Sequence, residues 1–188
     1  MLVKDTGPAR STFTTDLEAI RKRARAQMLD GAITQAYTAD RAQVVAVLNE
    51  TLATELVCVL RYKSHYYMAR GIDKAPVAAE FLQHAAEEQA HADMICDRIT
   101  QLGGEPNLDP DGLATRSHSE YLGGDTLQDL IKEDLVAERI AIETYSEVIA
   151  WLGEDDPTTR RMIEQILAME EEHANDLLDL LERIAKVS

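Results

Sequence analysis

Two short motifs place a glutamate and a histidine three residues apart, Glu88-x-x-His91 and Glu170-x-x-His173. Because residues three apart lie on one face of a helix, each pair could offer a carboxylate oxygen and an imidazole nitrogen to the same ion. Apolar residues at helical spacing surround both pairs, which predicts that they face a core. A single Glu-x-x-His pair is common on solvated helices, so a metal role depends on further donors.

Two further glutamates, Glu55 and Glu138, interrupt apolar stripes elsewhere in the chain. At 100° per residue, Glu55 shares its face with Leu52, and Glu138 shares its face with Leu135. The next Glu-x-x-His motif begins 33 residues after Glu55 and 32 residues after Glu138. The stretches "ELVCVLRY" and "ERIAIETY", which begin at these glutamates, both have a tyrosine seven residues on. This repeat predicts two related helical hairpins that face each other across a pseudo-twofold axis.

Together the two motifs and the two glutamates would bury four carboxylates and two imidazoles. Four buried carboxylates without partners are prohibitively costly to desolvate, whereas two divalent cations would balance their charge. Carboxylate and imidazole ligands favour iron, manganese or zinc, and bridging carboxylates can hold two metals about 3.5–4 Å apart. We therefore predict a di-metal site. The alternative is an acidic bundle with hydrogen-bonded Glu–His pairs and no metal.

Four long helices are expected to position these residues. The first is predicted to run from about residue 39 to Gly71, and the second from a first turn containing Pro76 to Gly103. The third is predicted to run from Asp125, with Gln128 in a capping box, to Gly153. The fourth is predicted to run from Asp156 almost to Ser188. The short links "GIDKA" and "GEDD" would join antiparallel neighbours, and the link over 103–124 is long enough to cross the bundle. No stretch alternates convincingly at period two. The predicted fold class is all-α, a four-helix bundle with one long crossover.

The N-terminal part of the chain is expected to lie outside this bundle. Residues 1–14 are polar and predict a loose arm, and a capping box from Thr15 to Glu18 predicts a short extra helix that ends near Gly31. That helix carries the basic stretch "RKRAR" at 21–25. This stretch indicates a solvated face, or else a contact with a neighbouring subunit or a nucleic acid. We divide the chain into an arm and short helix over 1–37 and a bundle domain over 38–188.

The net charge of the chain restricts the classes of partner that it is expected to bind. Lys and Arg number 19 against 34 Asp and Glu, a net charge of −15, which disfavours nucleic acid and anionic membranes and attracts cations. Only two cysteines are present, Cys58 and Cys96, so a disulfide scaffold is excluded, and we expect two buried thiols in a cytoplasmic protein. The N-terminal stretch has no apolar signal core, and runs such as "LVCVL" are too short to span a bilayer.

The motifs resemble those of the ferritin-like di-iron carboxylate proteins, and residues 43–183 are most similar to bacterioferritin, including its relatives in the Dps-like branch. The matching stretches are "LNETLATELVCVLRY", "EEQAHADMICDRITQLGGEPNL", "EDLVAERIAIETY" and "MEEEHANDLLDLL". The resemblance implies two iron ions per chain, with zinc or manganese as possible substitutes. The ligands it implies are Glu55, Glu88, His91, Glu138, Glu170 and His173. We assign bridging roles to Glu88 and Glu170 and terminal roles to Glu55 and Glu138, with Tyr62 and Asp134 in supporting positions.

This resemblance further implies a ferroxidase that oxidises Fe(II) with O2 or H2O2 and stores the Fe(III) as mineral inside a homo-oligomeric cage. The alternative is a non-storage di-iron or di-manganese peroxidase or catalase, and another is a non-catalytic shell that buffers zinc. Glu87 is a possible inner-surface feeder or a solvated residue. His65, His84 and His118 lie off the ligand stripe and are expected to be structural or solvent-facing.

Four departures from bacterioferritin refine these expectations. Gln89 stands where that family has its haem-binding methionine, so no haem is expected. The segment after His173 is too short for a fifth helix, and the crossover stretch "DGLATRSHSEYLGG" looks longer than the bacterioferritin link. These two features, with the extra N-terminal helix, favour a dodecamer over a 24-subunit cage.

Overall fold

The computed structural model describes residues 13–69 and 74–187, and the chain separates into two compact units, residues 1–34 and 35–188. The first unit contains α1, Leu17–Ala26, followed by one 3-10 turn, Met28–Asp30. The predicted capping box at Thr15 is wrong: the Asp16 carboxylate caps α1 by accepting a hydrogen bond from the Ala19 amide at 3.0 Å. Asp is as good an N-cap as Thr, so sequence alone could not separate the two positions.

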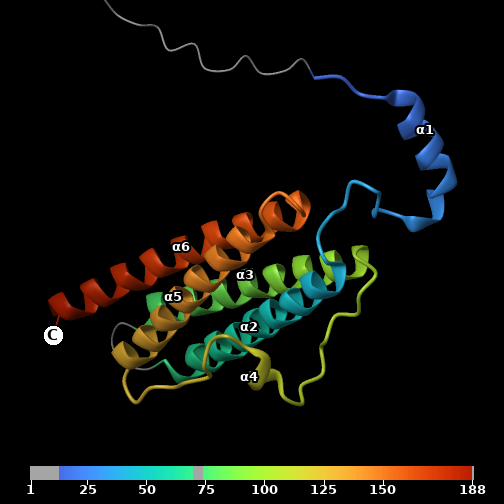
Figure 1. Cartoon of the computed structure of the whole chain (residues 1–188). Coiled ribbons are helices and arrows are strands. Elements are labelled where there is room, and N and C mark those ends of the chain that lie inside the picture. Colours follow the sequence, from blue (N-terminus) through green and yellow to red (C-terminus); the bar gives the residue numbers. More distant parts are fainter. Residues whose placement is uncertain (1–12, 70–73, 188) are drawn as a thin grey trace, which may run out of the picture. The chain divides into compact units, whose positions relative to one another are not determined.

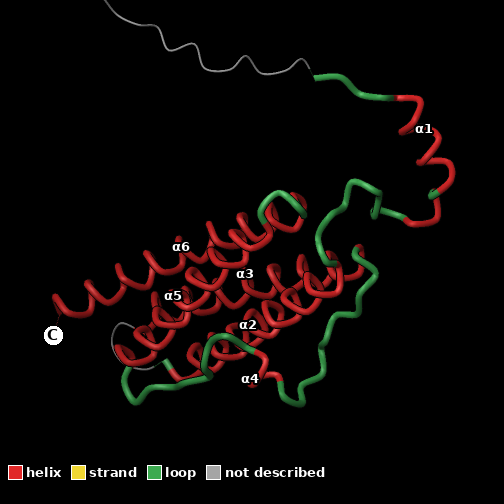
Figure 2. The backbone as a smooth tube through the Cα atoms, in the orientation of Figure 1, coloured by secondary structure: helices red, strands yellow, loops and turns green. Residues whose placement is uncertain are grey.

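The second unit is a four-helix bundle, and its helices run side by side in Figures 1 and 2. Two hairpins build it: α2 packs along α3, and α5 packs along α6. Every regular element in the described residues is helical, and the predicted all-α bundle with one long crossover is confirmed. The four helices are α2 (Arg41–Met68), α3 (Lys74–Gln101), α5 (Leu127–Leu152) and α6 (Pro157–Val187).

Side-chain caps set three of the helix starts. Asp40 caps α2 by accepting from the amides of Ala42 and Gln43. The start of α5 differs from the prediction by one residue, because Thr126 and Asp129 form the capping box instead of Asp125 and Gln128. The Asp156 carboxylate accepts from the Thr159 amide at 2.9 Å, as the predicted start of α6 requires. The predicted end at Gly71 and most of the link "GIDKA" lie outside the described residues.

The crossover between α3 and α5 contains a single turn of helix, α4 (Leu113–Arg116), which packs against α2. Buried polar side chains of α2 hold this segment: Arg61 donates to the Glu120 carbonyl at 3.0 Å, and Thr54 accepts from the His118 amide at 2.9 Å. Asp134 of α5 in turn binds both Arg61, at 2.9 Å, and His65, at 2.8 Å. The long connection is therefore fixed to the bundle by buried hydrogen bonds.

The interior of the bundle is mostly apolar. One cluster of buried residues packs Tyr62 and Phe81 against Ile131 and Leu177, so all four helices contribute to it. By length and composition alone α2 could cross a membrane, but 56% of its most apolar window is buried here. A core helix of a soluble protein meets the same description, and the packing of α2 inside the bundle gives its apolar character a structural reason.

Candidate metal centre

Six acidic and histidine side chains lie in the middle of the bundle, where the surrounding core is apolar. Each is exposed by 5% or less of its surface. Helices α2 and α5 supply one glutamate each, and α3 and α6 supply one Glu-x-x-His pair each. These six residues, called the centre below, are Glu55, Glu88, His91, Glu138, Glu170 and His173.

The helical faces assigned from the sequence agree with this burial. The neighbouring glutamates Glu143, Glu171 and Glu172 are all exposed, as their angular positions on α5 and α6 predict. Burial alone does not make a residue a metal ligand, so the ligand roles of the six remain a prediction. The arrangement of their donor atoms carries that argument further.

The donor atoms gather into two groups, in each of which all atoms lie within 4.8 Å of one another. Both groups contain Glu88 and Glu170, one from each Glu-x-x-His motif. The first group adds Glu55 and His91, and the second adds the remaining pair from α5 and α6. Two ions placed in these groups would share two carboxylates, which is the geometry of a bridged di-metal site.

Several of these buried atoms have no hydrogen-bond partner in the described chain: Glu88 Oε1, Glu138 Oε2, Glu170 Oε1 and His173 Nδ1. His173 Nδ1 lies 3.6 Å from Glu88 Oε1 and 3.6 Å from Glu170 Oε2, too far for a hydrogen bond. Unsatisfied buried polar atoms are rare in native proteins. Ligand atoms spaced in this way around a cation would each gain a partner, so the residues present fit a pair of divalent metal ions.

Two tyrosines brace the centre symmetrically. The Tyr62 hydroxyl on α2 donates to Glu138 on α5, and the Tyr145 hydroxyl on α5 donates to Glu55 on α2. Both tyrosines are fully buried. Tyr62 is selected from the sequence as a supporting residue, but Tyr145 is not. The signal for it was present, because "ERIAIETY" repeats the pattern in which Tyr62 follows Glu55.

Electrostatics of the metal-free centre favour bound protons. Burial and the nearby Glu88 raise the pKa of Glu55 to about 8, and burial with two neighbouring carboxylates raises the pKa of Glu138 well above its usual value. Burial would lower the pKa of His91, but the nearby carboxylates of Glu170, Glu55 and Glu88 raise it to about 12. The same opposition raises the pKa of His173 to about 10. Protons thus supply the positive charge that the carboxylates need when metal is absent.

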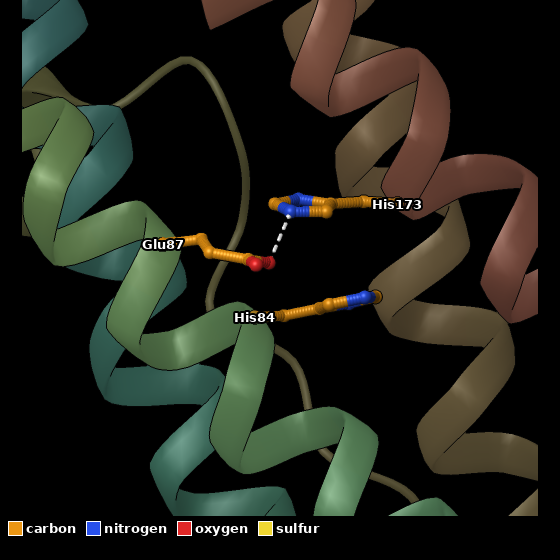
Figure 3. Close-up of side chains that lie close together, drawn as sticks. All are labelled: His84, Glu87 and His173. Carbon is orange, nitrogen blue, oxygen red and sulfur yellow. Dashed lines mark hydrogen bonds and ion pairs between the residues drawn. The ribbon is translucent and has the colours of Figure 1, made fainter.

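The second ring nitrogen of His173, Nε2, also has a partner, Glu87. The sequence had left the role of Glu87 open between an inner-surface feeder and a solvated residue. Glu87 Oε2 accepts a hydrogen bond from His173 Nε2 at 2.9 Å, as Figure 3 shows. A carboxylate that holds one ring nitrogen protonated leaves the other, Nδ1, free to bind a metal. Glu87 is half-buried on α3, whereas the adjacent Glu88 points into the centre. Its role could not be read from the sequence, because His173 belongs to another helix.

His84 also lies against the centre, although the sequence predicts only a structural or solvent-facing residue. Its ring is fully buried and stacks on His173 with 4.1 Å between ring centroids. Its Nδ1 lies 3.2 Å from the Tyr62 hydroxyl. Burial, and then the charge of His173, lowers the pKa of His84 to about 3. His84 is therefore a neutral ring beside the predicted metal ligands.

The remaining sequence-selected residues have other contacts. The described contacts of Asp134 are the ion pairs with Arg61 and His65 that hold the crossover. Gln89 is exposed and donates to Asp93 at 3.0 Å along α3. Cys58 and Cys96 are both free thiols. Cys58 is buried as expected, whereas Cys96 is only partly buried, so the expectation of two buried thiols is wrong for Cys96.

A four-helix bundle with a buried carboxylate and histidine centre between two pseudo-symmetric hairpins defines the class of this protein. Comparison with known protein families matches residues 45–187 to the ferritin-like domain, and the chain belongs to this ferritin-like family. The bacterioferritin of Mycobacterium avium is 32% identical over 146 residues, which cover 77% of this chain and 87% of that protein. The bacterioferritin of Desulfovibrio desulfuricans is 30% identical over 134 residues, 71% of each chain.

Solved structures show the same similarity. The bacterioferritin-related protein from Bacteroides fragilis, described as a dodecameric thioferritin, has a TM-score of 0.76 and 30% identity and covers 90% of this chain and 96% of that one. The bacterioferritin of Desulfovibrio desulfuricans, whose diiron site was seen in different catalytic states, has a TM-score of 0.69 and 26% identity over 78% of this chain and 82% of that one.

Proposed function

We propose that this chain is a ferroxidase and an iron-storage protein, with its site at the six-residue centre in residues 38–188. The observation that carries the proposal is the pair of donor groups sharing Glu88 and Glu170, with four orphaned buried donor atoms among them. Four carboxylates and two neutral imidazoles would balance two divalent cations. The similarity to bacterioferritins favours iron over other metals as the substrate, and zinc and manganese fit the same ligands.

Each residue of the centre has a proposed role. Glu88 and Glu170 bridge the two ions, because both belong to both donor groups. Glu55 and Glu138 are terminal ligands, and each is held in place by a tyrosine hydroxyl from the facing hairpin. His91 and His173 bind one ion each.

Oxidation of two Fe(II) to two Fe(III) releases two electrons, which reduce O2 to H2O2, or H2O2 to water, with uptake of two protons in either case. The chain itself holds the two ions side by side, keeps them in a buried environment, and carries groups that bind or release protons. The acidic character of the protein, with a net charge of −15, attracts Fe(II) from solution.

We further propose that the protein is cytoplasmic and assembles into a homo-oligomeric cage around the stored iron. The Bacteroides fragilis relative, which this chain covers for 96% of its length, is a dodecamer, and this favours twelve subunits over 24. We expect the cage to form without haem, because the exposed Gln89 replaces the residue that would bind it.

The ferroxidase activity is tested by measuring Fe(II) oxidation with stopped-flow absorbance in the variant Glu170→Ala. The matched control is Glu171→Ala. Glu170 is buried in the centre and Glu171 is exposed on the next position of α6. We expect fast oxidation to be lost in the first variant and kept in the second, with both assembling normally by gel filtration. Wild-type rates in Glu170→Ala would contradict the ligand assignment.

Storage is tested separately by counting the iron retained per chain after aerobic loading and gel filtration. Tens of ions or more per chain in a large particle would support a storage cage. About two per chain without mineral would keep the di-metal site and replace storage by peroxidase or catalase chemistry. No retained iron would contradict the iron assignment and make zinc and manganese the next metals to test.

A further inference from the structure

A further group of side chains that could hold a metal ion lies beside the centre, on the adjoining faces of α3 and α6. His84 Nε2 lies 3.5 Å from Glu80 Oε1 and 3.8 Å from Asp176 Oδ2, and one donor atom from each of the three residues lies within 4.8 Å of the other two. The His84 side chain is fully buried, while Glu80 and Asp176 are 29% and 44% exposed. The three residues, called the side cluster below, thus join a buried imidazole to two carboxylates that solvent can reach.

The hydrogen bonds of His84 determine which of its nitrogens carries the proton. The Tyr62 hydroxyl has one hydrogen, which it donates to Glu138. With Tyr62 as that donor, its oxygen accepts from His84 Nδ1, and this assignment places the hydrogen on Nδ1 and a lone pair on Nε2. The lone pair of a buried nitrogen then points toward two carboxylates, which are themselves acceptors.

This arrangement leaves His84 Nε2 unsatisfied. The atom is buried and has no hydrogen-bond partner within the part of the chain that the structure describes. Three acceptors that face one another repel unless a positive ion lies between them. A divalent cation bound to Nε2, Glu80 and Asp176 would satisfy all three, and one imidazole with two carboxylates is a common ligand set for iron, manganese and zinc.

The internal repeat of the chain shows that the fold does not require these polar residues. Glu88 and Glu170 are 82 positions apart, and so are His91 and His173. When the same offset of 82 positions is applied to the three residues of the side cluster, it leads to apolar residues at the other end of the centre. The residues at the three equivalent positions are Met162 for Glu80, Ile166 for His84 and Met94 for Asp176.

We propose that Glu80, His84 and Asp176 form a third divalent-cation site, separate from the six-residue centre and open to solvent on one side. Figure 3 shows the His84 ring beside His173, and Tyr62 connects His84 to Glu138. The site is therefore in contact with the predicted di-metal centre through the His84 ring. Its ability to bind a cation rests on its own three ligands and does not depend on iron oxidation at the centre.

The experiment uses zinc as the probe, because it binds these ligands without changing oxidation state. Metal-free protein is loaded with Zn(II), zinc per chain is counted after equilibrium dialysis, and crystals of the loaded protein are measured at the zinc edge. We expect three zinc ions per chain, one of them about 2.1 Å from His84 Nε2. The double variant E80Q/D176N should bind two, because it keeps the centre and loses both carboxylates of the side cluster.

The matched control is E171Q/E172Q, which removes two exposed carboxylates from α6 and should keep three zinc ions. All four substitutions fall on partly or fully exposed side chains, so folding is expected to survive them. The proposal is overturned if no zinc peak appears beside His84 in the wild-type protein, or if that peak persists in E80Q/D176N. Failure of the proposed ferroxidase would appear elsewhere, as slow Fe(II) oxidation by wild-type protein.

Discussion

Metal binding at the centre is expected to release protons, because the pKa values of four of its residues are raised. At pH 7 the metal-free centre holds a proton on His91, whose pKa is about 12, and one on His173, whose pKa is about 10. Glu55, with a pKa of about 8, and Glu138, with a pKa well above its usual value, are largely protonated too. A metal ligand must be deprotonated, so loading the centre should release about four protons per pair of ions.

The assay is isothermal titration of metal-free protein with Zn(II) in two buffers that differ in their heat of ionisation. The difference between the two heats gives the number of protons released. The variant E80Q/D176N is the best background, because it confines zinc to the centre. Since the metal-free centre holds more protons than the loaded one, zinc affinity must rise with pH, by roughly 10⁴ per pH unit for the pair near pH 6–7.

A matched pair of variants on α5 tests the origin of these protons. Glu138→Gln removes one buried carboxyl and should lower the release by about one proton, while Glu143→Gln, exposed on the same helix, should leave it unchanged. The reasoning is refuted if the wild-type protein releases one proton or fewer per pair of zinc ions. Equal release by the two variants would remove Glu138 from the set of titrating ligands.

Three further outcomes follow from contacts in the structure. Glu87→Gln should weaken zinc binding at the centre by about 10- to 100-fold, measured by competition with a chelating dye, because Gln no longer holds the histidine as strongly; unchanged affinity would make Glu87 a bystander. Asp156→Ala should lower stability by about 3–5 kcal/mol, because it leaves the buried Arg98 unpaired, whereas the exposed Asp155→Ala should cost less than about 1 kcal/mol; thermal melting compares them, and similar melting temperatures would argue against the buried pair. Haem added to the protein should give no Soret band, since Gln89 offers no methionine sulfur, and stoichiometric binding would overturn that prediction.

The helices and their faces were predictable because both depend on local information. Periodicity at 100° per residue separates Glu170 from Glu171 without any knowledge of neighbouring helices, and the burial of the first and exposure of the second agree with it. The internal repeat adds that Glu55 and Glu138 occupy equivalent positions. Caps were predicted less well, because adjacent Thr and Asp residues are almost equally good N-caps.

Residues that act across helices were harder to predict. His84 and Glu87 lie outside the ligand pattern, and each gains its place from the ring of His173 on a different helix. A sequence gives the angular position of a side chain on its own helix. It does not give the axial offset between two packed helices, and that offset decides which side chains meet.

By itself the sequence determined four long helices, the apolar face of each, a repeat of two hairpins, and six polar residues that must share one core. These properties follow from short-range periodicity and from the cost of burying charge without partners. Only the tertiary structure decided that tyrosines brace glutamates of the opposite hairpin, that Arg61 and Asp134 hold the crossover, and that Glu80 and Asp176 converge on His84. Each of these contacts joins residues far apart in the chain, and it exists because the packed helices bring side chains from different segments within bonding distance.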